Sequence, residues 1–265
     1  MRDILEDAMG QGADPVKTAQ EAMKTPLPKR FYKTVEVVSA EGGFAVQLDG
    51  KPIKTPARGD LVLPNENTAK LIADEFEAQE TEIDPALMPV TRLANTALDG
   101  VASDPQAVFE DILIFASSDL LLYRADAPAG LVERQSESWD PVLDWFRDEF
   151  GANFILAEGI VHVAQPKEAL VIFSACLRSH DDPISLACLH TVTSLTGSAL
   201  LAMAAGRRFM SATQIWEAAH VDENWNIQHW GEDEEASKRR GLREREFNAA
   251  LSMLYSLDQN IKIIK

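Results

Sequence analysis

The sequence has few of the residues that build several common kinds of site. Its two cysteines, Cys176 and Cys188, lie twelve positions apart. This spacing predicts neither a disulfide framework nor a paired metal or redox motif. Long hydrophobic runs are also missing, because apolar stretches such as residues 199–205 fall short of the roughly 20 residues that span a bilayer. We therefore expect a reducing compartment and no membrane insertion.

The N-terminus lacks the features of a targeting segment. It begins MRDILEDAMGQGADP, which contains no apolar signal core and carries acidic residues that are atypical of a mitochondrial transit peptide. A chain that starts in this way predicts a bacterial, cytoplasmic protein.

Positive charge is scarce. The 265 residues include 25 Lys and Arg against 42 Asp and Glu, which gives a formal net charge of −17. Nucleic acids and anionic membrane surfaces are bound mainly by clustered Lys and Arg, so neither is an expected partner. The 46% hydrophobic and 25% charged content is typical of an ordinary globular protein. The acidity fits solubility and attraction to a basic protein surface.

Motifs for catalysis are absent as well. The chain has no G-x-x-x-x-G-K-[ST] phosphate loop, no G-x-S-x-G nucleophile elbow and no H-E-x-x-H pair. His220 and Glu223 share a helical face and form half of a carboxylate-bridged metal motif, but the second half is missing. We expect a protein that is not an enzyme and has no cofactor. A metal-dependent hydrolase using His220, Glu223 and His229 remains an alternative.

The periodicity of apolar residues predicts an α+β protein. Residues 1–28 carry few large apolar groups and are interpreted as a flexible N-terminal arm. Residues 29–88 predict a β-rich antiparallel domain, because apolar residues alternate over 35–48, turns surround Gly42 and Gly50, and a short strand follows at 61–64. Asn65 or Asn67 would begin a covering helix with Leu71, Ile72, Phe76 and Gln79 on one face.

Residues 89–265 predict an all-helical C-terminal domain. Asp104-Pro105 would open a helix with Phe109, Ile112, Leu113 and Ala116 on its inner face, and Ser138 or Asp140 before Pro141 would open the next. A short strand-like piece lies near 159–163. The other expected helices cover residues 90–102, 167–179, 183–204, 211–228 and 232–257.

The segment HVDENWNIQHWGEDEEASKRR, residues 220–240, has acidic residues first and basic residues second. This order suits a well-capped helix with Glu234–Lys238 and Glu235–Arg239 pairs, and Trp230-Gly231 would form the corner before it. The same segment also suits a protein-binding patch, in which tryptophans anchor a partner and carboxylates select its register. Local physics leaves both interpretations open.

A series of segments along nearly the whole chain resembles one known family. They include KRFYKTVEV, LDGKPIKTPAR, LIADEFEAQ, IDPALMPVTRLANTALD, SDLLLYRA, RQSESWDPVLDWF, GSALLAMA and DENWNIQHWGEDEEASKRR. In this order they resemble the Atp-twelve family of assembly chaperones, which attend the α subunit of the F-type ATP synthase head. Two positions depart from the pattern, because Phe76 stands where the family usually has tryptophan and Leu122 where it often has cysteine.

The resemblance implies a binding protein without catalysis. It would capture the unassembled α subunit and shield its subunit interface until the β subunit replaces it. A monomer suits this role, in the cytoplasm of bacteria and in the mitochondrial matrix of eukaryotic relatives. A general protein-binding scaffold remains an alternative.

The resemblance also implies an important acidic residue within the DENWNIQHWGEDEE block. The implied partner-binding residues are Glu223, Glu232, Glu235, Asp222, Asp233 and Trp230, and those implied to give structural support are Phe76 and Trp225.

Overall fold

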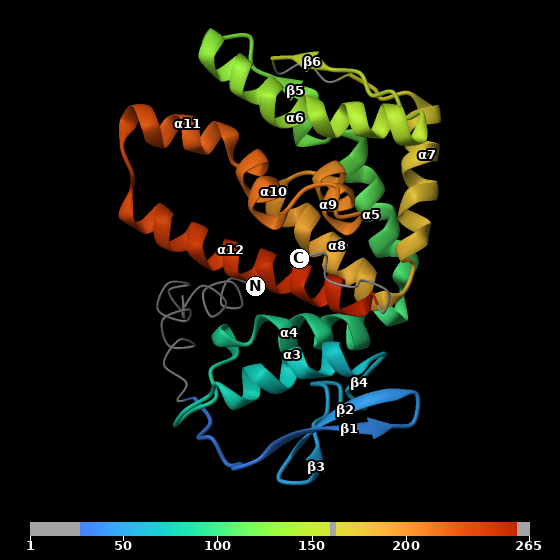
Figure 1. Cartoon of the computed structure of the whole chain (residues 1–265), viewed down its shortest axis with the longest axis vertical. Coiled ribbons are helices and arrows are strands. Elements are labelled where there is room, and N and C mark those ends of the chain that lie inside the picture. The colour runs from blue at the N-terminus through green and yellow to red at the C-terminus, as the bar shows by residue number, and fades with distance from the viewer. Residues whose placement is uncertain (1–26, 160–162, 259–265) are drawn as a thin grey trace, which may run out of the picture.

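A computed structural model describes residues 27–159 and 163–258. The expected arm, residues 1–28, lies outside the described residues except for its last two. Figure 1 shows a small sheet at one end of the molecule, helices stacked above it in successive layers, and α6 at the far end. The α+β class expected from the sequence is confirmed.

The N-terminal sheet is built around one central strand. Strand β1 (Val35–Ala40) pairs antiparallel with β2 (Gly43–Leu48), and the short strands β3 (Lys51–Pro52) and β4 (Val62–Leu63) also pair with β2. A Cβ atom at Gly43 would lie 2.1 Å from the carbonyl oxygen of Leu63, so only glycine allows β4 to approach this closely. The predicted meander is thus confirmed.

Helix α3 (Glu66–Glu77) covers this sheet and connects it to the helical part. Asn65 is its N-cap, with its side-chain oxygen accepting from the Thr68 amide at 2.9 Å. The Asn65 amide group donates to the carbonyl oxygen of Ser256 in the last helix, and the Thr68 and Ser256 hydroxyls lie 2.7 Å apart. These bonds tie the first covering helix to the C-terminal end of the described chain.

The predicted helix over residues 90–102 is instead a chain of short helical segments. After a 3-10 turn at Pro85–Leu87, α4 covers Pro89–Asn95, a π-helical turn covers Thr96–Gly100 and a 3-10 turn covers Val101–Ser103. The next helix, α5 (Pro105–Ser117), is capped by Asp104 as expected. Phe109, Ile112 and Ala116 are buried on its inner face, which confirms the predicted pattern.

The helix predicted to open at Ser138 or Asp140 begins earlier, so that prediction is wrong. Helix α6 spans Ala129–Phe150 and holds Pro141 in its interior. Proline in a helix loses one backbone hydrogen bond and normally marks a start or a kink. Here the buried face of Trp139, Val142 and Phe146 continues through the proline position, and packing of that face outweighs the local penalty.

Two predicted helices are each divided in two. Residues 183–204 form α8 (Pro183–Thr196) and α9 (Ala199–Gly206), because Gly197 adopts φ 70° and Ser198 caps the second helix. Residues 211–228 form α10 (Ala212–Ala219) and α11 (Val221–Trp230), with His220 between them. The remaining helices, α7 (Lys167–Leu177) and α12 (Glu234–Leu257), agree with the predictions to within a few residues.

A two-stranded parallel pair also lies within the helical part. Strand β5 (Tyr123–Arg124), after a 3-10 turn at Leu120–Leu122, pairs with β6 (Ala157–Glu158). The strand expected at 159–163 thus occurs slightly earlier, and residues 160–162 are outside the described part of the chain. Cys176 and Cys188 are buried and unpaired. Across the described ranges, no helix is both long enough and apolar enough to cross a membrane.

One hydrophobic core runs through both parts of the molecule. It extends from Val46 and Leu63 in the sheet to Leu254 in α12, and its centre is α9, in which residues 199–205 are all buried. Alanines in α9 let α8 and α12 pack closely around it. The division into domains at residues 29–88 and 89–265 stays a prediction, because the core is continuous across that boundary.

Candidate functional site

The sequence block that resembles the family's functional segment forms a helical hairpin. Helix α11 ends at Trp230, Gly231 adopts φ 88°, and α12 begins at Glu234; the segment that joins the two helices is at the left of Figure 1. A cavity of about 390 Å³ lies between them, with Glu223, Ile227, Trp230, Asp233 and Arg240 among its lining residues. The corner predicted at Trp230-Gly231 is thus confirmed.

Trp230 is the most exposed large apolar side chain in the described structure. It is 86% exposed and lies at the turn that joins the two helices of the hairpin. A tryptophan in water gives no stabilisation by burial, whereas the same indole can bury a large apolar area against a partner. Its exposure therefore favours an interaction surface over a role in the core.

Three acidic residues of the block stabilise the start of α12. The Asp233 carboxylate accepts from the Ala236 amide at 2.7 Å and is the N-cap. Glu235 pairs with Arg239 at 2.6 Å, and Glu234 pairs with Lys238 at the same distance. The predicted i, i+4 pairs are therefore confirmed. Each pair is exposed, so it contributes little to stability and can open toward a partner.

Glu232 and Asp222 have different surroundings. The Glu232 carboxylate accepts from the Ser237 hydroxyl in the first turn of α12. Asp222 accepts at 2.7 Å from the side-chain amide of Gln135, which is only 2% exposed. Gln135 in turn accepts from the Ala125 amide at 2.8 Å. Asp222 therefore tethers α11 to α6 and satisfies a buried polar group.

Glu223 faces the α11–α12 cavity with its carboxylate 3.8 Å from Nε2 of His220. His220 is buried, its Nδ1 lies 2.7 Å from the Trp216 carbonyl oxygen, and burial lowers its pKa. A neutral imidazole does not neutralise the carboxylate at pH 7, so the negative charge of Glu223 remains available to a ligand in the cavity.

The metal-site alternative is not supported by the geometry. His229 is exposed and directs Nδ1 to the Trp225 carbonyl oxygen at 2.7 Å, whereas His220 is bonded to Trp216. In residues 27–159 and 163–258, no three His, Cys, Asp or Glu side chains gather as a metal site would require.

Trp225 and Phe76, the two residues predicted to give structural support, pack against different parts of the molecule. Trp225 packs over Gly130 of α6, where a Cβ would meet its ring at 2.8 Å, and the Arg134 guanidinium lies 5.1 Å from its ring centre. Phe76 lies edge-on to Tyr32 with centroids 5.9 Å apart, and the Tyr32 hydroxyl donates to the Phe76 carbonyl oxygen at 2.7 Å.

Sequence reasoning missed two features of this region. The first is Gln135, which precedes Trp139 by one helical turn and thus lies on the buried face of α6. This spacing in the sequence could have indicated that the Gln135 side chain is buried and hydrogen-bonded. The second is a cavity of about 380 Å³ between α6 and α10. Its lining comes from two stretches that are far apart in the sequence, residues 137–141 and residues 209–218, and no local pattern brings them together.

Known proteins resemble the chain in sequence and in structure. The family model for the ATP12 chaperone protein matches residues 29–147. The crystal structure of a candidate chaperone from Agrobacterium tumefaciens is 53% identical, with a TM-score of 0.86 over 93% of this chain and 92% of that one. The crystal structure of Atp12 from Paracoccus denitrificans is 36% identical, with a TM-score of 0.82 over 87% of this chain and 99% of that one.

A eukaryotic protein is also similar over part of its length. The mitochondrial protein atp12 of Schizosaccharomyces pombe is 26% identical over 157 residues, which is 54% of each chain. The alignment thus spans about half the length of this curated relative.

Proposed function

This chain belongs to the ATP12 chaperone family, and from that premise we propose that it is a chaperone for ATP synthase assembly that binds the unassembled α subunit. In this proposal the protein covers the surface through which the α subunit later contacts the β subunit. It acts by binding alone, as a monomer in the bacterial cytoplasm.

The observation that carries the proposal is the combination of Trp230 and Glu223 at one cavity. Trp230 is 86% exposed and supplies an aromatic anchor, while Glu223 supplies a negative charge a few residues away on the same helix. Such a pair suits a client surface with an apolar pocket and a nearby basic residue. Glu232, Glu235 and Asp233 extend the negative surface along the start of α12.

The energetics of assembly fit a chaperone that works without nucleotide hydrolysis. A subunit taken from an obligate ring exposes a large and partly apolar interface, which promotes aggregation. A chaperone that covers part of this interface lowers the concentration of the exposed form by mass action. The β subunit then displaces it because the native interface is larger and binds more tightly.

The proposal predicts that Glu223→Lys and Trp230→Ala each weaken capture of the α subunit by tenfold or more, since both groups contact the client. Glu232→Lys should weaken it to a smaller extent. Capture is measured by mixing each purified variant with isolated α or β subunit and following comigration in size-exclusion chromatography. The far-UV circular dichroism of all three variants should match that of the wild type.

Glu41→Lys is the matched control, because it makes the same charge change in the distant β1–β2 turn. Asp222→Asn separates tethering from contact, since the amide keeps an acceptor for Gln135 while it removes the charge. Comigration with neither subunit, when both are folded, would overturn the proposal. Equal binding of α, β and unrelated unfolded proteins would favour a general scaffold.

A further inference from the structure

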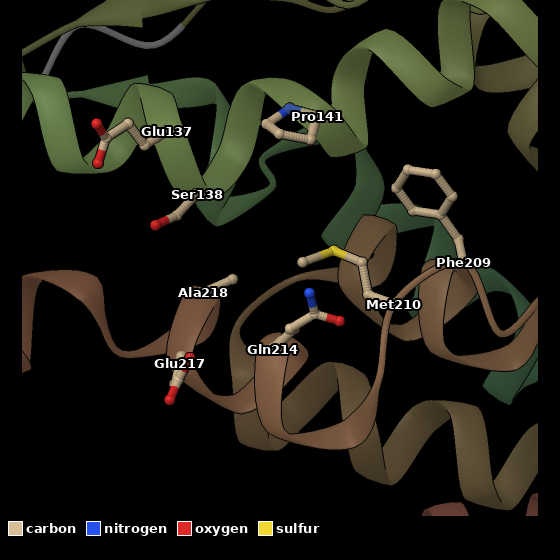
Figure 2. Close-up of a pocket in the computed structure, with 8 residues that line it drawn as sticks. All are labelled: Glu137, Ser138, Pro141, Phe209, Met210, Gln214, Glu217 and Ala218. Carbon is tan, nitrogen blue, oxygen red and sulfur yellow. The ribbon is translucent and has the colours of Figure 1, made fainter.

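The cavity between α6 and α10 is separate from the α11–α12 cavity, and the two share no lining residue. Figure 2 shows that one wall comes from α6 and the other from α10 and the turn before it. The lining residues are Glu137, Ser138, Pro141, Phe209, Met210, Gln214, Glu217 and Ala218. Its volume of about 380 Å³ lies within the range of about 300–1,000 Å³ for ligand pockets.

The base of this cavity is apolar and firmly supported. Phe209 is 40% exposed and stacks on Trp145 with ring centroids 4.7 Å apart, and this stacking fixes the position of the Phe209 ring. Met210 lies beside it with an unbranched thioether that adapts to ligands of different shape. The Pro141 ring adds apolar surface on the opposite wall.

The rim of the cavity is negatively charged. Glu137 and Glu217 are both exposed, one on each wall, and neither forms an ion pair within the described residues. Among the residues that the structure describes, no Lys or Arg lines the cavity. Pro141 has no amide hydrogen. The backbone carbonyl oxygen of Glu137, one turn earlier in α6, therefore lacks its usual helical donor. The rim thus offers acceptors and negative charge around an apolar base.

We propose that this cavity is a second client-binding site, which takes a short segment carrying a large apolar side chain flanked by Lys or Arg. The apolar side chain would enter between Pro141, Phe209 and Met210, and the flanking cations would reach Glu137 and Glu217. This inference rests on the proposed chaperone function in one respect only, namely that the segment belongs to the client protein. Two separate contacts also fit exchange during assembly, since each can be released in turn while the other retains the client.

A labelled peptide with one phenylalanine between two lysines in a Gly/Ser background tests this chemistry directly. Fluorescence polarisation should show saturable binding to the wild-type protein. The double variant E137Q/E217Q should bind about fivefold more weakly or worse, because two ion pairs are lost while the shape is kept. Peptides with glutamate in place of lysine, or alanine in place of phenylalanine, should also bind more weakly by fivefold or more.

The matched control is E41Q/E110Q, which removes two exposed carboxylates from the β1–β2 turn and from α5 and should leave binding unchanged. A second measurement locates the site: the same peptide with benzoylphenylalanine in place of phenylalanine should form photocrosslinks within residues 209–218. Crosslinks to residues outside both 209–218 and the α6 wall at 137–141, or full binding by E137Q/E217Q, would overturn the inference.

These experiments use no ATP synthase subunit, so the two proposals fail separately. Capture of the α subunit by a protein that does not bind the peptide would overturn the second site alone. Binding of the peptide without capture of the α subunit would overturn the proposed function alone.

Discussion

At the scale of single residues, Asp119 links two segments that the sequence places 80 residues apart. Its carboxylate accepts from the Leu121 amide at 3.1 Å and from the Leu200 amide at 3.0 Å, so it caps both the 3-10 turn before β5 and the start of α9. Burial raises the pKa of Asp119 to about 6 in spite of these bonds. The desolvation of the buried carboxylate raises the pKa by more than its hydrogen-bond donors lower it.

This raised pKa predicts how stability depends on pH. The pKa of Asp119 in the folded state exceeds the ordinary aspartate value of 3.8, so between pH 4 and 6 the folded state binds more protons than the unfolded state. The Asp119 contribution is therefore most favourable below pH 4 and is lost as pH rises through 6, by up to about 3 kcal/mol. Urea unfolding at several pH values measures this slope.

Asp119→Asn is the control for this prediction, because the amide does not titrate. The variant should be less stable, since its NH2 group faces backbone donors, and the difference in unfolding free energy from the wild type should vary with pH between 4 and 6. A difference that is constant across this range would show that Asp119 does not titrate there.

At the scale of elements, the orientation of α11 depends on a close contact with α6. Trp225 lies over Gly130, and the Gln135–Asp222 bond holds the same pair of helices one turn further on. This seam sets the orientation of α11, which ends at Trp230 beside the turn of the hairpin. The seam is therefore a structural requirement for the proposed client surface. Gln135 is buried in it and Trp225 is half-buried, whereas Asp222 is exposed.

Gly130→Ala tests the seam. A Cβ would lie 2.8 Å from the Trp225 ring, so the ring must shift and the variant should lose about 1 kcal/mol of unfolding free energy. In a Trp225→Phe background the smaller ring leaves room, and the same substitution should stabilise by up to about 1 kcal/mol through helix propensity. A double-mutant cycle in urea measures the coupling. Stabilisation in both backgrounds would contradict tight packing at this position.

At the scale of the whole molecule, the sheet and the helices share one core. The sheet residues Val46 and Leu63 belong to the same buried cluster as Leu254 of α12, and Asn65 and Thr68 bond to Ser256. All five tryptophans lie between residues 139 and 230, so their fluorescence reports only on the helical part. This distribution gives a way to test whether the parts unfold together.

We expect one cooperative unfolding transition, because separating the sheet from α12 would expose part of the shared core to water. Hydrogen exchange of the β2 amides should give the same free energy of unfolding as tryptophan fluorescence in urea. A lower value for β2 would show that residues 29–88 open independently, as a separate domain would.

Several features could be predicted from the sequence because they depend on neighbouring residues. The alternation at 35–48, the caps Asn65 and Asp104, and the Glu235–Arg239 pair all require contacts within a few positions, and all occur as predicted. Helix ends were harder to predict. Packing carries α6 through Pro141, while Gly197 and His220 end helices within runs whose apolar pattern continues.

The sequence by itself determined the α+β class, the family resemblance and the acidic segment with its two tryptophans. Only the tertiary structure decided which of these groups face water. It placed Trp225 and Asp222 in the seam with α6, left Trp230 exposed beside Glu223, and brought Glu137 and Glu217 to opposite walls of one cavity. The physical reason is that exposure and cavity shape depend on contacts between residues far apart in the chain, which no local pattern encodes.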